Sequence, residues 1–163
     1  TRWCVRSRGL GDVYKRQMLG WAREHHPAIP VSLEIEKPRD GIEALFCQAD
    51  VLLFSGDYAR HRGYDEPAAL LRGVSRLQTG ADLYCTRGAA GAVSMDTAGA
   101  EYSQGALATG PVVDTLGAGD VFNAGVIDGY LGGRDMPGIL HRACALAGKK
   151  CTQTGFAGLT AVD

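Results

Sequence analysis

The sequence is short of the features that define several protein classes. It has five cysteines among 163 residues, an odd number without a C-x-x-C pair. We therefore expect neither a disulfide framework nor a zinc site, and a reducing cytoplasm is favoured. No apolar run approaches the roughly 20 residues that span a bilayer. The net charge of −1 gives no basic surface for nucleic acid or for an anionic membrane, so neither is expected as a partner.

Histidine is also scarce, and its distribution bears on metal binding. The four histidines show no H-x-x-x-H spacing, and no C-x-x-C pair accompanies them. Surface or hydrogen-bonded histidines are the simpler interpretation, and we assign no direct metal ligand.

The first 17 residues differ from the rest of the chain. They carry five basic residues against one acidic residue and show no helical or alternating apolar pattern. A basic arm for nucleic acid is one interpretation. We favour a non-native or unstructured segment, because GDVYKRQ (residues 11–17) resembles a translated junction. We expect residues 18–163 to form one folded region.

Beyond this segment, strand patterns alternate with helix patterns. Apolar or alternating runs indicate strands at 29–35, 50–55 and 82–86. Helical spacing indicates helices at 18–26, 41–48, 65–78, 118–131 and 135–151. In the helix at 65–78, Asp65 is expected to cap the start and Leu77 to belong to the apolar stripe. This order predicts the α/β class with a mainly parallel sheet.

The stretch Asp114–Asp120 (DTLGAGD) is the strongest local signal. Its small residues can expose backbone N–H groups at the start of the helix at 118–131, where an anion such as phosphate binds. Asp120 would stand beside that anion, where a carboxylate can take a proton from an attacking hydroxyl. A plain Gly-rich turn with an acidic helix start is the alternative. The stretch lacks the Gly-Lys-Ser/Thr of a P-loop and the third small residue of a dinucleotide fingerprint.

Residues 113–125 (VDTLGAGDVFNAG) resemble the signature of the ribokinase-like (PfkB) sugar kinases, and favour their ketohexokinase-like (fructokinase) members. Further matches lie in order at 31–39 (VSLEIEKPR), 86–92 and 147–151 (AGKKC), with Gly-Phe at 155–156. The resemblance implies a three-layer, Rossmann-like ribokinase fold. It also implies an ATP- and Mg²⁺-dependent enzyme that phosphorylates a sugar hydroxyl, which for ketohexokinase-like members is at C1 of fructose.

The resemblance also assigns roles to residues. Asp120 would be the catalytic base, and Gly117, Ala118 and Gly119 would form the anion hole for the γ-phosphate. The implied nucleotide-binding residues are Gly88, Ala89, Ala90, Gly91, Thr115, Cys144, Ala147, Gly148, Cys151 and Ser55. By their own pattern, Gly88–Gly91 could equally form a tight hairpin, and the stripe from Cys144 to Cys151 could be core. Ser55-Gly56-Asp57 stands where many members carry an Asn-x-x-Glu motif that organises magnesium.

The resemblance covers only part of the family's domain. The sugar-binding Asp, the Gly-Gly-Asn region and the lid of these kinases lie in their N-terminal half and have no match here. We therefore expect a chain truncated on its N-terminal side, inactive alone, from a parent protein that could be a homodimer. The alternatives are a nucleotide-binding fragment without catalysis and another family member, such as a ribokinase or an adenosine kinase.

Overall fold

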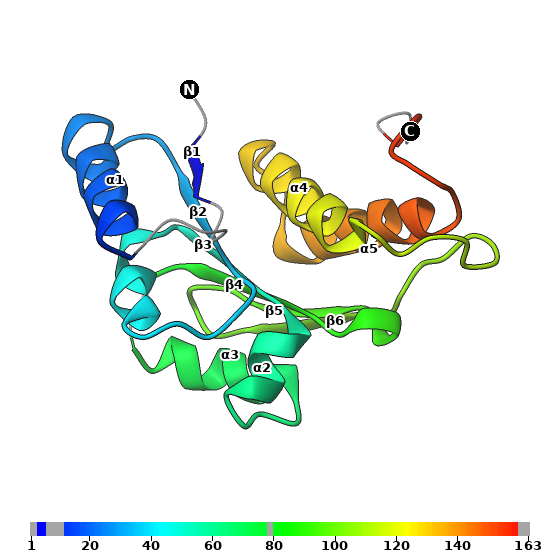
Figure 1. Ribbon diagram of the computed structural model, residues 1–163, viewed down its shortest axis with the longest axis horizontal. Helices are drawn as coiled ribbons and strands as arrows, with labels where there is room; N and C mark the ends of the chain where they lie inside the picture. Colours follow the sequence, from blue (N-terminus) through cyan, green and yellow to red (C-terminus); the bar gives the residue numbers. More distant parts are fainter. Residues whose placement is uncertain (1–2, 6–11, 78–79, 160–163) are drawn as a thin grey trace. The chain divides into compact units, whose positions relative to one another are not determined.

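The computed structural model describes residues 3–5, 12–77 and 80–159 (Figure 1). They fall into two compact units. Unit 1 runs up to Cys85 and includes Ser94–Glu101, and unit 2 comprises Thr86–Val93 and the chain from Tyr102 onward. Each unit is described by itself.

Unit 1 is built on parallel strands. These are β1 (Trp3–Val5), β2 (Val31–Ile35), β3 (Val51–Phe54) and β4 (Asp82–Thr86), paired in that order. Leu33 of β2 stands opposite Leu52 of β3, which in turn stands opposite Leu83 of β4. All three leucines are buried, as expected for parallel strands that read as apolar runs.

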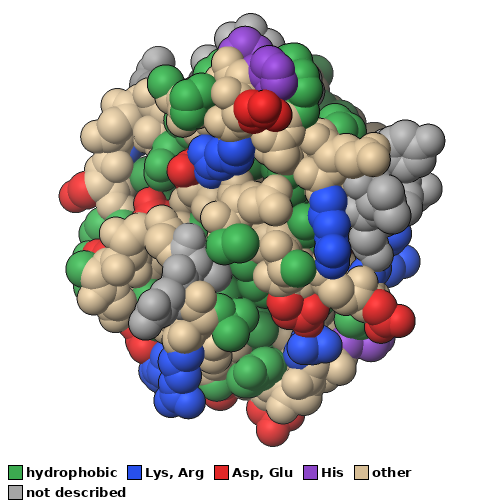
Figure 2. Space-filling model, turned by 90° about the vertical axis from the view of Figure 1, so that its left-hand side faces the viewer, with side chains coloured by type: hydrophobic (Ala, Val, Ile, Leu, Met, Phe, Trp, Pro, Cys, Tyr) green, Lys and Arg blue, Asp and Glu red, His purple; other side chains and the backbone are tan. Residues whose placement is uncertain are grey.

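Helices connect these strands. They are α1 (Asp12–His25), the 3₁₀ helix η1 (Ile42–Gln48), α2 (Gly56–His61) and α3 (Pro67–Ser75). Ion pairs tie them to their surroundings, for example Arg23 to Asp50 at 2.8 Å. On the face shown in Figure 2, Lys and Arg side chains are interspersed with Asp and Glu side chains.

Two further strands extend the hydrogen-bonded order to β1-β2-β3-β4-β5-β6. They are β5 (Ala92–Met95) and β6 (Glu101–Gln104). Only residues 87–91 join β4 to β5, and only residues 96–100 join β5 to β6. Connections this short join antiparallel neighbours, so the sheet is mixed with a parallel part in β1–β4.

Unit 2 is dominated by α4 (Ala118–Leu131) and α5 (Met136–Cys151), which lie side by side in Figure 1. Glycines on α4 permit the close approach. A Cβ atom at Gly125 would lie 2.9 Å from the Cα atom of Ala143 on α5. The short 3₁₀ helix η2 (Gly88–Ala90) belongs to the same unit.

Several expectations need correction. Helix α1 begins at Asp12, not at residue 18, and Trp3–Val5 pairs with β2, so the described parts of the first 17 residues adopt regular structure. Their proposed foreign origin stays a prediction. Helix α3 starts at Pro67 after Glu66, so Asp65 is not its cap, and Leu77 lies beyond its end with 57% exposure. Within the described ranges, no helix has the length and apolar character needed to cross a bilayer.

Candidate nucleotide site in unit 2

The turn before α4 has the geometry expected of a glycine-rich helix start. Gly117 is the N-cap residue of α4, with φ +80°, in the left-handed region that favours glycine. The Ala118 N–H donates to the Thr115 carbonyl at 3.1 Å, and the Val121 N–H donates to the Gly117 carbonyl at 3.0 Å. The first N–H groups of a helix lack partners within the helix, so this start can bind an anion.

Gly117 and Gly119 differ in how much space surrounds them. A Cβ atom at Gly117 would lie 2.6 Å from Cζ of Phe156, so that ring covers the turn at close range. A Cβ atom at Gly119 would meet nothing within 4 Å. Gly117 is therefore required by backbone conformation and contact, whereas Gly119 borders open space.

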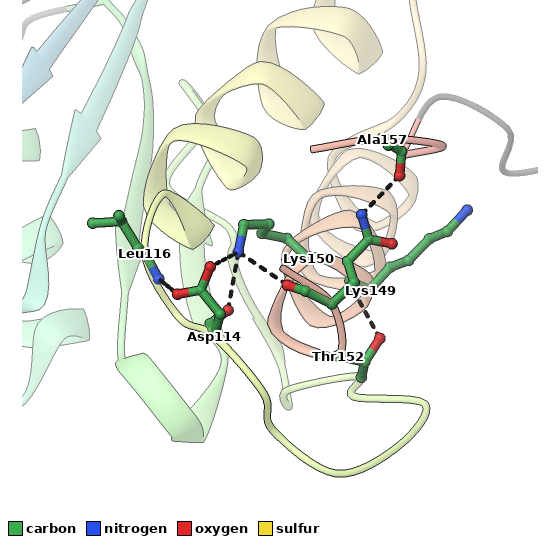
Figure 3. A network of polar contacts seen from close by, with 7 residues as sticks. Asp114, Leu116, Lys149, Lys150, Thr152 and Ala157 are labelled. Carbon is green, nitrogen blue, oxygen red and sulfur yellow. Dashed lines mark hydrogen bonds and ion pairs between the residues drawn. The ribbon is translucent and has the colours of Figure 1, made fainter. Parts of the chain in front are cut away.

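A polar network fixes the residues just before this turn (Figure 3). Asp114 accepts a hydrogen bond from the Leu116 N–H at 2.9 Å through Oδ1 and one from Lys150 Nζ at 2.8 Å through Oδ2. The Lys150 hydrogen bond, followed by that of the Leu116 N–H, lowers the pKa of Asp114 below its usual 3.8. The network therefore favours the ionised form of Asp114 and ties it to Leu116 and to Lys150.

Unit 2 contains a cavity of about 520 Å³, within the size range of small-molecule sites. Four segments line it: the turn after β4, the loop after β6, the start of α4 and one face of α5. The sequence-predicted residues that it brings together are Gly88, Ala89, Gly91, Thr115, Ala118, Gly119, Cys144, Ala147, Gly148 and Cys151. Residues far apart in the sequence thus share one cavity.

Other predicted residues do not line this cavity. Ala90, Gly117 and Asp120 are sequence neighbours of lining residues but are not among them. Asp120 stands in the first turn of α4 and is half-buried. Ser55 belongs to unit 1, where its hydroxyl accepts from the Tyr58 N–H and donates to the Glu36 carbonyl, both at 2.9 Å. Its contacts in the structure are those of a helix cap.

The cavity also has lining residues that sequence reasoning missed. These are Thr86, Ala106, Ala108, Val112 and Phe122. Phe122 is only 3% exposed, so it belongs to the packed core as well as to the cavity wall. The loop residues carry no periodic signal. Their loop lies against α5 at Gly148, where a Cβ atom would lie 2.3 Å from the Leu107 carbonyl oxygen.

The cysteines of α5 lie on the cavity wall without features of a nucleophile. Burial raises the pKa of Cys144 to about 11, and the nearby positive charge of Arg87 only partly opposes this effect. The thiol is therefore protonated at neutral pH and contributes apolar surface. The stripe from Cys144 to Cys151 is both packed and cavity-lining, and its role in nucleotide binding stays a prediction.

In the part of the chain that the structure describes, no three His, Cys, Asp or Glu side chains gather closely enough to hold a metal ion. Magnesium commonly keeps several waters and is held by one or two carboxylates together with substrate phosphates.

Comparisons with known proteins identify the family of the chain. Residues 14–160 match the sequence profile of the pfkB family carbohydrate kinases. The chain belongs to this family. It is 40% identical to ketohexokinase from Mus musculus over 150 residues, which cover 88% of the chain and 50% of the mouse protein. The chain therefore spans about half the length of this relative.

Solved structures show the same fold. Ribokinase from Arabidopsis thaliana, solved with ribose and ATP, matches with a TM-score of 0.76 at 20% identity, covering 93% of this chain and 50% of that one. Adenosine kinase from Sinorhizobium meliloti matches with a TM-score of 0.73 at 22% identity, covering 87% of this chain and 47% of that one. The expected α/β ribokinase fold is thereby confirmed.

Proposed function

We propose that unit 2 binds ATP in its cavity and directs the terminal phosphate to the start of α4. The observation that carries this proposal is the convergence of the Gly88–Gly91 turn, the start of α4 and the α5 face on one cavity of about 520 Å³. Small and apolar side chains leave room for a base and ribose. The start of α4, with the N–H group of Gly119, supplies fixed dipoles for the phosphate, and the Ala118 N–H is shared with the Thr115 carbonyl.

In this proposal the reaction is transfer of the γ-phosphoryl group to a sugar hydroxyl. The hydroxyl oxygen forms a bond to the γ-phosphorus atom while the bond to the β–γ bridging oxygen breaks and ADP leaves. Asp120 accepts the hydroxyl proton as general base. The start of α4 stabilises the negative charge that the phosphoryl oxygens carry during transfer. Bound magnesium supplies further neutralisation of the phosphate charge.

The proposed acceptor is C1 of a ketohexose such as fructose. The support is the 40% identity to mouse ketohexokinase, which exceeds the identities to the ribokinase and the adenosine kinase described above. We further propose that residues 18–163 form the nucleotide-binding and catalytic-base half of the kinase domain. The sugar would be held largely by the other half.

The test is a coupled assay of ADP release, with the product identified by ³¹P NMR. The longer protein that contains this chain should turn over fructose to fructose 1-phosphate. Preference for ribose or adenosine would favour another member of the family. Nucleotide binding without turnover of any sugar would favour the binding-module alternative. The 163-residue chain alone should bind ATP but show no fructose-dependent ATP consumption.

The gene itself offers an independent test of the half-domain proposal. An open reading frame that continues upstream of Met18 through a Gly-Gly-Asn-containing half supports it. A genuine start codon near Met18 contradicts it.

A further inference from the structure

Lys150 is a cation with no exposed surface, located at the end of α5 beside the anion-binding turn. Its Nζ atom donates to three oxygens: Asp114 Oδ2 at 2.8 Å, the Asp114 carbonyl at 3.0 Å and the Gln153 carbonyl at 3.3 Å. It also lies 5.6 Å from the centre of the Phe156 ring. Burying an ammonium group is costly unless it is paired and hydrogen-bonded, as it is here.

The partners of Lys150 belong to the two segments that shape the turn. Asp114 begins the DTLGAGD stretch, and its other carboxylate oxygen holds the Leu116 N–H. Gln153 lies in the segment after α5 that carries Phe156, whose ring covers Gly117. One ammonium group therefore fastens both the approach to the turn and the segment that covers it (Figure 3).

The positive charge of Lys150 also offsets negative charge near the turn. Asp114 and Asp120 place two carboxylates on either side of a turn that is to receive a phosphate. Carboxylates repel a phosphate, and at short range inside a protein this repulsion is much stronger than in water. The ammonium group of Lys150 compensates Asp114 at 2.8 Å and leaves the second carboxylate for chemistry.

Resting on the function proposed above, we propose that Lys150 is a positioning residue for the terminal phosphate of ATP. Its ammonium group holds Asp114 and the turn at 114–119 in the conformation that receives the phosphate, and it cancels the charge of Asp114. The effect is specific to the terminal phosphate, because the base and the ribose would contact other walls of the cavity.

The neighbouring lysine provides a matched control. Lys149 Nζ donates to the Gly158 carbonyl at 2.8 Å, away from Asp114. Lys149→Met and Lys150→Met therefore remove the same group from adjacent positions of one helix. Lys150→Gln is a second variant that keeps much of the side-chain length and a hydrogen-bond donor while removing the charge.

The experiment is isothermal titration calorimetry of Mg-ATP and Mg-ADP with the 163-residue chain and its variants, with folding checked by circular dichroism. Lys150→Met and Lys150→Gln should lower the affinity for ATP by ~10-fold or more relative to ADP, the size expected for losing a charge-assisted hydrogen bond. Lys149→Met should leave the ratio of the two dissociation constants unchanged. Methylammonium should partly restore the ratio in Lys150→Ala, whereas tetramethylammonium at equal ionic strength should not.

The outcomes separate the two proposals. A wild-type chain that is folded but binds neither nucleotide contradicts the proposed function. Suppose instead that the wild-type chain binds ATP and that folded Lys150→Gln keeps the wild-type ratio of the ATP and ADP dissociation constants. This result overturns the positioning role of Lys150 and leaves the proposed function intact. Equal losses for ATP and ADP in both Lys150 variants also overturn the positioning role, because they indicate a merely structural role.

Discussion

The Nζ atom of Lys150 lies 2.8 Å from Oδ2 of Asp114, a residue 36 positions earlier in the chain. This contact joins the end of α5 to the loop that leads into the start of α4. The Val113 N–H donates to the Cys151 carbonyl at 2.7 Å and strengthens the same junction. The two regions that carry the family signatures are thus fastened to each other within unit 2.

Acid should weaken this junction. Lys150 lowers the pKa of Asp114 below 3.8, so the ionised carboxylate stabilises the folded chain above that pH. This contribution is lost as the pH falls through the lowered pKa in the folded state. The difference in melting temperature between the wild-type chain and Asp114→Asn should therefore be largest above about pH 5 and shrink towards pH 3. A difference that is constant over this range would contradict the ionised pair.

Asp120 should be needed for turnover and not for nucleotide binding. In the full kinase, Asp120→Asn should lower kcat by ~10²–10⁴-fold, as expected for loss of a general base, with little change in the dissociation constant of ATP. Asp128→Asn is the matched control on α4, because Asp128 is exposed and pairs with Arg142 at 3.2 Å. Unchanged kcat in Asp120→Asn would remove Asp120 from the mechanism.

The two glycines of the turn should respond differently to alanine. Gly117→Ala should destabilise the chain by about 1–2 kcal/mol or more, because φ is +80° and the methyl group would meet Phe156. Gly119→Ala should leave the melting temperature nearly unchanged, because open space surrounds that position. It should still weaken ATP binding, since its methyl group would enter the cavity. Equal melting temperatures of the two variants would contradict this assignment.

Cys144 should be resistant to alkylation near neutral pH. Its pKa of about 11 keeps the thiol protonated, and only the thiolate reacts readily. At pH 8, iodoacetamide should modify the exposed Cys47 well before Cys144, as measured by peptide mass spectrometry. Labelling of Cys144 should accelerate as the pH approaches 11. Rapid labelling of Cys144 in the folded chain at pH 8 would contradict its burial.

Local patterns were enough to predict elements in both units. Strand β4 and helix α4 were predicted with their observed bounds, because apolar periodicity and flanking glycines specify them strongly. The turn before α4 followed from its small residues, and ten of the residues expected at the site do line the cavity.

The features that could not be predicted from the sequence depend on tertiary contacts. Ala106 and Ala108 reach the cavity because their loop lies against Gly148, a proximity that no local pattern encodes. Lys149 and Lys150 look alike as a basic pair at a helix end. They differ in the face of α5 on which they lie. Lys150 follows the buried Ala143 by seven residues and therefore lies on the same, buried face of the helix. The early start of α1 was missed because residues 11–17 resemble a translated junction and were assigned to a non-native or unstructured segment.

The most direct test of the account is an NMR titration of the ¹⁵N-labelled 163-residue chain with a non-hydrolysable Mg-ATP analogue and, separately, with adenosine. Both ligands should shift the amide signals of Gly91 and Gly148, which line the cavity. Only the triphosphate should strongly shift those of Ala118 and Gly119 at the start of α4. Equal shifts of Ala118 and Gly119 with both ligands, or none with the triphosphate while Gly91 and Gly148 respond, would contradict the claim that this turn receives the terminal phosphate.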